Sequence, residues 1–123
     1  MKKVIASILL AVLFLAGCGQ EAGYVQITAQ EAKQIMDSGE DCLILDVRTQ
    51  EEYDESHIPG AVVIPHDQIR DRASADLPGK DRLILVYCRS GRRSKEAAET
   101  LAALGYTNVK EFGGINDWPY GVT

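Results

Sequence analysis

The residues best suited to chemistry lie in 83–94, LILVYCRSGRRS. An apolar run from Leu83 to Tyr87 ends at Cys88, and a short loop rich in arginine follows. A segment of Ala, Glu and Leu with helical spacing then begins at about Lys95. Loop amides at a helix N-terminus, with arginines beside them, lower the pKa of a cysteine below its free value of about 8.5. The pattern predicts a reactive thiolate, and the plainer alternative is a buried strand cysteine followed by a solvated basic turn.

The elements that would position this loop alternate along the chain. Two S/T-x-x-E patterns, beginning at Thr28 and Thr49, are typical of capping boxes that open helices. Short continuous apolar runs indicate buried parallel strands. We expect helices at 28–38, 49–55, 66–75 and 95–104, and strands at 42–47, 61–64, 83–87 and 109–112. This order predicts one α/β domain with a mostly parallel central sheet and helices on both faces.

A second group of polar residues follows the strand expected at 42–47. Asp46 and Cys88 both fall at carboxyl ends of strands, where sites in parallel sheets lie. Arg48 is close enough in sequence to pair with Asp46, and Glu52 is a candidate partner of Arg48. We expect Asp46 and Arg48 to support the cysteine loop, and the alternative is a purely structural ion pair.

The first residues of the chain have the pattern of an export signal. Lys2 and Lys3 precede an apolar run that is too short to span a bilayer as a helix of about 20 residues. The sequence Leu-Ala-Gly-Cys18 resembles the lipobox of bacterial lipoproteins. We therefore expect a lipoprotein signal peptide at 1–17, lipidation of Cys18, a tether at 18–26 and an exported, lipid-anchored location in the cell envelope. An ordinary signal peptide with an incidental cysteine is the alternative.

The charge of the chain limits its partners. Removal of residues 1–17 would take away Lys2 and Lys3, so the formal charge of −5 becomes −7. An acidic body argues against nucleic acid or anionic lipid as the main partner. The three arginines near Cys88 are a local exception, which suggests a small anion as ligand.

Cys42 is left over once Cys18 and Cys88 have been assigned. It opens its expected strand, about 13 Å from the carboxyl end of the sheet where Cys88 lies. A disulfide tolerates a Cα separation of only about 4.4–6.8 Å. We therefore expect Cys42 to be structural and not to pair with Cys88.

Three segments together resemble the single-domain rhodaneses, which are thiosulfate sulfurtransferases. They are LDVRTQEEYDESHIPGAVVIP, LILVYCRSGRRS and ALGYTNVKEFGGINDW, and the resemblance covers 27–121. It implies transfer of sulfane sulfur from thiosulfate or a similar small anion to a thiol, cyanide or protein acceptor. It also implies a persulfide intermediate, a monomer, and no metal or organic cofactor.

The resemblance also implies roles for individual residues. Cys88 would carry the sulfur, the following loop would bind substrate and persulfide, and three further polar residues would support the site. The loop residues are Arg89, Ser90, Gly91, Arg92, Arg93 and Ser94, and the supporting residues are Asp46, Arg48 and Glu52. Gly91 is expected at a positive φ. Arg92 stands where the family often has a small polar residue, so the site is expected to be more cationic. The family's preference for an acceptor is therefore not assigned to this chain.

Other functions remain open. Phosphatases of related folds use Cys-x5-Arg, but Ser94 stands where that arginine would be, and Arg93 comes one position early. Sulfur transfer requires no general base. We therefore expect His57 to have a structural role and not a catalytic one. A rhodanese-fold binding module or a persulfide carrier acting on an envelope protein partner is the alternative.

Overall fold

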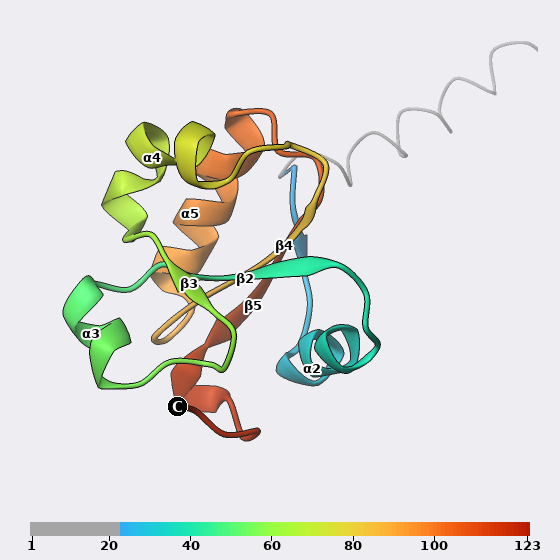
Figure 1. Ribbon diagram of the computed structural model, residues 1–123, viewed down its shortest axis with the longest axis vertical. Helices are drawn as coiled ribbons and strands as arrows, with labels where there is room; N and C mark the ends of the chain where they lie inside the picture. Colours follow the sequence, from blue (N-terminus) through green and yellow to red (C-terminus); the bar gives the residue numbers. More distant parts are fainter. Residues whose placement is uncertain (1–22) are drawn as a thin grey trace, which may run out of the picture.

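A five-stranded parallel sheet forms the centre of the computed structural model, which describes residues 23–123 (Figure 1). The strand order is β1-β5-β4-β2-β3, and the central strand β4 is buried along its whole length. The strands are β1 Val25–Gln26, β2 Cys42–Asp46, β3 Val62–Val63, β4 Leu83–Cys88 and β5 Val109–Gly114. The predicted α/β class is confirmed.

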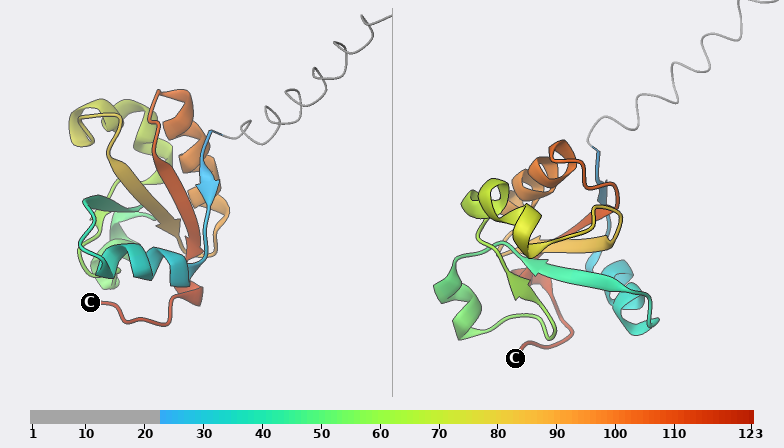
Figure 2. Two further views of the ribbon diagram at one scale, coloured as in Figure 1. Left: turned by 90° about the vertical axis from the view of Figure 1, so that its right-hand side faces the viewer. Right: turned by 45° about the horizontal axis from the view of Figure 1, so that its top comes forward.

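Helices cover both faces of the sheet, as predicted. Helices α4 and α5 pack on one face, and α2 packs on the other (Figures 1 and 2). The bounds are α2 Ala29–Asp37, α3 Gln50–Glu55, α4 Ile69–Asp76 and α5 Arg92–Ala103, with short 3-10 helices η2 His66–Gln68 and η3 Ile115–Asp117. No helix within residues 23–123 is long and apolar enough to cross a bilayer.

Both predicted capping boxes are present. The Thr28 hydroxyl accepts from the Glu31 amide at 3.0 Å, and the Glu31 carboxylate accepts from the Thr28 amide at 2.9 Å. Thr49 and Glu52 form the same reciprocal pair at 3.1 and 2.9 Å. Because each box satisfies backbone donors that the first turn leaves unpaired, these two helix starts were readable from local sequence.

The limits of the domain differ from those expected. Val25 and Gln26, placed in the tether, form the edge strand β1 and pair with β5. Thr123, beyond the expected end at 121, exchanges two 2.9 Å backbone hydrogen bonds with His57. Such short edge pairings carry no apolar pattern of their own. The expected signal peptide, most of the tether and Cys18 lie outside the described residues.

Helix α5 begins at Arg92, three residues before the predicted start at Lys95. Gly91, with a φ of +110°, reverses the chain, and the Lys95 amide already donates to the Gly91 carbonyl at 3.3 Å. Arg92, Arg93 and Ser94 therefore belong to the first helical turn. Only residues 89–91 separate β4 from α5.

Side chains of β4 alternate between the two faces of the sheet. Val86 and Cys88 lie in the core under α4 and α5, whereas Tyr87 lies in the core that α2 covers. The parallel register aligns Asp46 with Tyr87 and Glu111 with Val86. Asp46 therefore shares a face with Tyr87, and Glu111 shares a face with Cys88.

Candidate active site

Cys88 is the last residue of β4, and its side chain is buried against the start of α5. The Gly91 amide donates to Cys88 Sγ at 3.0 Å, and Ser94 Oγ lies 3.3 Å from the same sulfur. The positive φ predicted for Gly91 is confirmed. An amide and a hydroxyl therefore face the sulfur from one tight turn, at the positive end of the α5 dipole.

Gly114 supports the loop from the neighbouring strand. A Cβ at this position would lie 2.6 Å from the Ser90 amide nitrogen and closer still to the Arg89 carbonyl. The Asn116 amide also donates to the Arg89 carbonyl at 3.1 Å. An irregularity in the β4–β5 register brings Gly114 opposite Cys88. The loop backbone thus rests directly on a residue that must lack a side chain.

Arg93 is committed to an ion pair. Its Nη1 and Nη2 donate to Glu52 Oε1 and Oε2 at 2.9 and 3.1 Å. The hydrogen bonds from Arg93 lower the pKa of Glu52 to about 2, and the bond to Glu52, assisted by Cys88, raises the pKa of Arg93. The expected pairing of Glu52 with Arg48 is wrong. The Arg48 guanidinium donates instead to Asp46 and the Ser56 carbonyl, and Glu52 turns toward α5.

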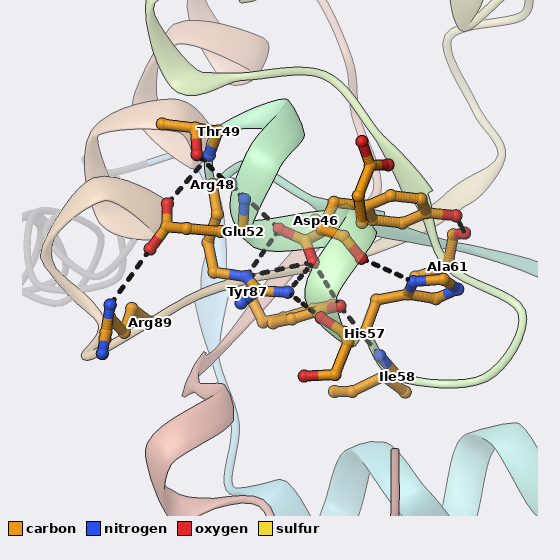
Figure 3. A network of polar contacts seen from close by, with 12 residues as sticks. Asp46, Arg48, Thr49, Glu52, His57, Ile58, Ala61, Tyr87 and Arg89 are labelled. Carbon is orange, nitrogen blue, oxygen red and sulfur yellow. Dashed lines mark hydrogen bonds and ion pairs between the residues drawn. The ribbon is translucent and has the colours of Figure 1, made fainter. Parts of the chain in front are cut away.

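The two other arginines of the loop remain exposed. Arg89 is 63% exposed at its side chain, with Nη1 at 3.5 Å from Glu52 Oε2 (Figure 3). Arg92 is 81% exposed and lies 3.8 Å from Glu96. Both side chains are available to an anion that approaches the loop, whereas Arg93 is not.

Asp46 is the centre of a buried hydrogen-bond network (Figure 3). Arg48 Nη2 and Nε donate to its carboxylate at 2.8 and 3.1 Å, and Tyr87 Oη donates to it at 2.6 Å. The Ile58 amide donates to Tyr87 Oη, and Arg48 also donates to the Ser56 carbonyl. Burial, assisted by the bond to Asp46, raises the pKa of Tyr87.

This network fixes the segment after α3. Within the described residues it has no hydrogen bond to residues 89–94, which form the loop after Cys88 and the first turn of α5. Asp46 and Cys88 share the carboxyl edge of the sheet, as predicted, but their side chains lie on opposite faces. No hydrogen bond within the described residues connects Asp46 or Arg48 to the cysteine loop, which favours the alternative interpretation of a structural ion pair.

The structural interpretation of His57 is confirmed. Its ring stacks on Tyr53 at a centroid distance of 3.8 Å, and its Nδ1 lies 2.9 Å from the Tyr53 carbonyl. Phe112 and Trp118 lie in the buried cluster that α2 covers. None of these side chains faces Cys88.

Glu111 is the buried polar residue that sequence reasoning missed. Its carboxylate accepts from Ser94 Oγ at 2.6 Å, the Gly113 amide at 2.9 Å and Gln26 Nε2 at 3.2 Å. Only 1% of the residue is exposed. A signal was present, because Glu111 shares the period-2 face of the buried Val109.

Cys42 lies at the opposite end of the sheet from Cys88. Its register partner is Leu83, the first residue of β4, whereas Cys88 is the last. Within residues 23–123 both cysteines are free, and the predicted placement of Cys42 and Cys88 at opposite ends of their strands is confirmed. The described residues also hold no group of three or more His, Cys, Asp or Glu side chains placed to bind a metal ion.

The protein is of the α/β class, with a five-stranded parallel sheet. A short loop surrounds the cysteine at the end of its central strand. The family model for the rhodanese-like domain matches residues 28–119. The chain therefore belongs to the rhodanese-like family, and it consists of a single such domain over the described residues.

Two curated relatives and one solved structure illustrate the similarity. The thiosulfate sulfurtransferase PspE of Escherichia coli (strain K12) is 40% identical over 73 residues, 59% of this chain and 70% of that protein. A sulfurtransferase of Allochromatium vinosum is 38% identical over 94 residues, 76% of this chain and 86% of that protein. A structure described as rhodanese with anions from E. coli has a TM-score of 0.62 and 35% identity, over 67% of this chain and 96% of that one. These relatives support sulfur transfer as the general activity.

Proposed function

We propose that this protein is a sulfurtransferase that takes sulfane sulfur from thiosulfate or a similar small anion. The sulfur would pass through a persulfide on Cys88 to a thiophilic acceptor, such as cyanide, a thiol or a protein. The observation that carries the proposal is the position of Cys88 Sγ, 3.0 Å from the Gly91 amide at the start of α5. The naming of PspE for thiosulfate and of the E. coli rhodanese structure for bound anions supports the donor class.

In the first half-reaction the Cys88 thiolate attacks the outer sulfur of thiosulfate. The bond between the two donor sulfurs breaks, sulfite leaves with that electron pair, and Cys88 becomes a persulfide anion. The negative charge moves outward by one sulfur but never leaves the loop. Fixed N–H groups such as that of Gly91 stabilise it without reorganisation, together with the α5 dipole.

In the second half-reaction a nucleophile such as cyanide attacks the outer sulfur of the persulfide. The sulfur–sulfur bond breaks, thiocyanate leaves, and the Cys88 thiolate is restored. Arg89 and Arg92, exposed beside the loop, would attract both anionic reactants. Rigid seating of the loop on Gly114 would keep the N–H groups in place through both steps.

Turnover of thiosulfate and cyanide to thiocyanate by the full-length protein tests the proposal, with Cys88→Ser as the comparison. A sulfurtransferase loses all turnover in the variant. Turnover that is equal in the two proteins would contradict the proposal. Absence of turnover in both would favour the alternative of a binding module or of a carrier that requires a protein donor.

We also propose that the domain is exported and held at a membrane by lipid on Cys18. The support is the sequence Leu-Ala-Gly-Cys18 after a short apolar run. Cys18→Ala should move the protein from the membrane fraction to the soluble fraction, and the wild type should incorporate labelled fatty acid. A wild-type protein that takes up no label would refute the anchor.

A further inference from the structure

Glu111 joins two parts of the site that lie on either side of the Cys88 loop. Its Oε2 accepts a hydrogen bond from Ser94 Oγ at 2.6 Å and another from the Gly113 amide at 2.9 Å. Ser94 belongs to the first turn of α5, and Gly113 belongs to β5. One oxygen of a buried carboxylate therefore ties the helix that follows the loop to the strand that supports it.

On the α5 side, this contact holds the amide that faces the sulfur. Ser94 Oγ also lies 3.0 Å from the Gly91 carbonyl and 3.3 Å from Cys88 Sγ. Gly91 is the N-cap of α5, and its amide donates to Cys88 Sγ at 3.0 Å. Because Ser94 and Gly91 share the first helical turn, a displacement of Ser94 would also displace the Gly91 backbone.

On the β5 side, the same oxygen holds a bulge in the strand. In the register with β4, Glu111 is opposite Val86. Gly114 is opposite Cys88, so β5 contains one extra residue between the two pairs. Gly113 lies inside this bulge with a φ of +95°, and its amide is the one that donates to Glu111. The carboxylate therefore fixes the position of Gly114, on which the backbone of the loop rests.

The partners of Glu111 depend on the reach of its side chain and not on its charge. In the described part of the chain they are the Ser94 hydroxyl, the Gly113 amide and, on Oε1, the Gln26 side-chain amide at 3.2 Å. All three are neutral donors. The Oε1 of a glutamine at this position would accept the same two bonds from Ser94 and Gly113. Gln26 is exposed, so it would be free to turn its amide and accept from the new Nε2.

We propose that Glu111 is a positioning residue for sulfur transfer, which holds the Gly91 amide and the Gly113–Gly114 segment in place around Cys88. Negative charge stays inside the loop throughout the proposed reaction, and a displaced N–H group would stabilise it less. The inference rests on the proposed function in this respect, because it assigns the Gly91 amide to the reacting sulfur.

Two substitutions separate reach from charge. Glu111→Asp keeps the carboxylate but withdraws it by one methylene group, whereas Glu111→Gln keeps the length and removes the charge. In turnover of thiosulfate and cyanide by the full-length protein, Glu111→Asp should lower kcat by about tenfold or more. Glu111→Gln should stay within about twofold of the wild type. The KM for thiosulfate should change little in either variant, because the exposed Arg89 and Arg92 are unaltered. The opposite result, with Glu111→Gln impaired and Glu111→Asp active, would overturn the proposal.

Amide hydrogen exchange, followed by NMR on the same proteins, does not depend on turnover. The Gly91 and Gly113 amides should exchange about tenfold faster in Glu111→Asp and at the wild-type rate in Glu111→Gln. The Thr107 amide, which donates to the Lys80 carbonyl at 2.9 Å away from the site, should exchange equally in all three proteins. This exchange pattern without any turnover would refute the proposed function and leave the positioning by Glu111 standing. Equal exchange of Gly91 in the wild type and Glu111→Asp would refute the positioning itself.

Tyr106→Phe is the control for a general loss of stability. Tyr106 Oη lies 2.6 Å from the Leu77 carbonyl and 3.0 Å from the Ala73 carbonyl, so this variant also removes buried hydrogen bonds, but on the far side of α5 from the loop. Its kcat should equal that of the wild type. A tenfold loss of kcat in Tyr106→Phe would show that lower stability alone explains the effect of Glu111→Asp.

If Glu111→Asp fails to fold, Ser94→Ala provides the test, because it removes the contact with α5 and leaves Glu111 in place. The Gly91 amide should then exchange faster than in the wild type, while the Gly113 amide stays protected by its own bond to Glu111. Unchanged exchange of Gly91 in Ser94→Ala would contradict the proposal.

Discussion

Glu52 and Arg93 join the first turn of α3 to the first turn of α5 through two hydrogen bonds of 2.9 and 3.1 Å. The same Glu52 carboxylate closes the capping box of α3. One partly buried side chain therefore fixes a helix start and anchors the turn that follows the Cys88 loop. Because Arg93 is paired with Glu52, it is not available to bind an anionic substrate.

Glu52→Gln should lower the free energy of unfolding by about 1 kcal/mol at neutral pH, or the Tm by about 5 °C. The pKa of Glu52 is about 2 in the folded protein, against an ordinary 4.5. Its stabilisation is therefore complete above pH 4.5 and is lost as the pH falls toward 2. Thermal unfolding across this range should show the two proteins converge in acid. Exposed Glu51→Gln is the control, and a difference that does not vary with pH would refute the account.

Arg89→Ala and Arg92→Ala should each raise the KM for thiosulfate by about threefold, because both guanidinium groups are exposed and screened. The Tm should hardly change, and added salt should reduce the effect. Arg93→Ala should instead lower the Tm, since it breaks the pair with Glu52. Steady-state kinetics at low and high salt, with unfolding curves, distinguish these results. An unchanged KM in both exposed variants would remove them from donor binding.

Gly114→Ala should reduce thiosulfate turnover by about tenfold or more, because the new Cβ displaces the backbone of residues 89–90 from Cys88. Gly39→Ala is the matched control. That glycine has a φ of +86° and open space around it, so its substitution costs about 1 kcal/mol without touching the site. Full activity in folded Gly114→Ala would show that the loop does not require close contact with a residue that lacks a side chain.

Asp46→Asn should lower the free energy of unfolding by about 3 kcal/mol, since Arg48 is left buried without its counter-charge. Because no hydrogen bond joins the network to the Cys88 loop within the described residues, kcat/KM of the folded variant should stay within about twofold of the wild type. Denaturant unfolding and kinetics on the same samples measure both. A large loss of kcat/KM with unchanged stability would restore Asp46 as a support of the loop.

Local patterns were sufficient where one segment determines its own structure. The capping residues Thr28 and Thr49 satisfy backbone groups within the same turn, so four residues of sequence predict each helix start. The apolar run before Cys88 likewise identifies a buried strand. Gly91 was readable for the same reason, because a tight turn between a strand and a helix demands its positive φ.

Relationships between strands were not readable in this way. Asp46 was placed at the correct edge of the sheet, but its face depends on the register that aligns it with Tyr87 and not with Cys88. Glu111 becomes part of the site only because β5 lies beside β4 with Glu111 opposite Val86. Gly114 faces the loop through an irregularity in that pairing. Each of these arrangements depends on how two strands pair, which the sequence of either strand alone does not show.

The early start of α5 has a different cause. Two arginines and a serine after Gly91 looked like loop residues because of their charge. Arginine is a good helix former, however, and Arg93 gains an ion pair in the first turn. Local composition did not determine where α5 begins, and the tertiary contact of Arg93 with Glu52 favours a start at Arg92.

The most direct test of the central claim is mass spectrometry of the full-length protein after treatment with thiosulfate and no acceptor. The account predicts the added mass of one sulfur atom on the peptide that contains Cys88, its loss when cyanide is added, and its absence in Cys88→Ser. An adduct on Cys42, or one that survives Cys88→Ser, would contradict a persulfide carried by Cys88.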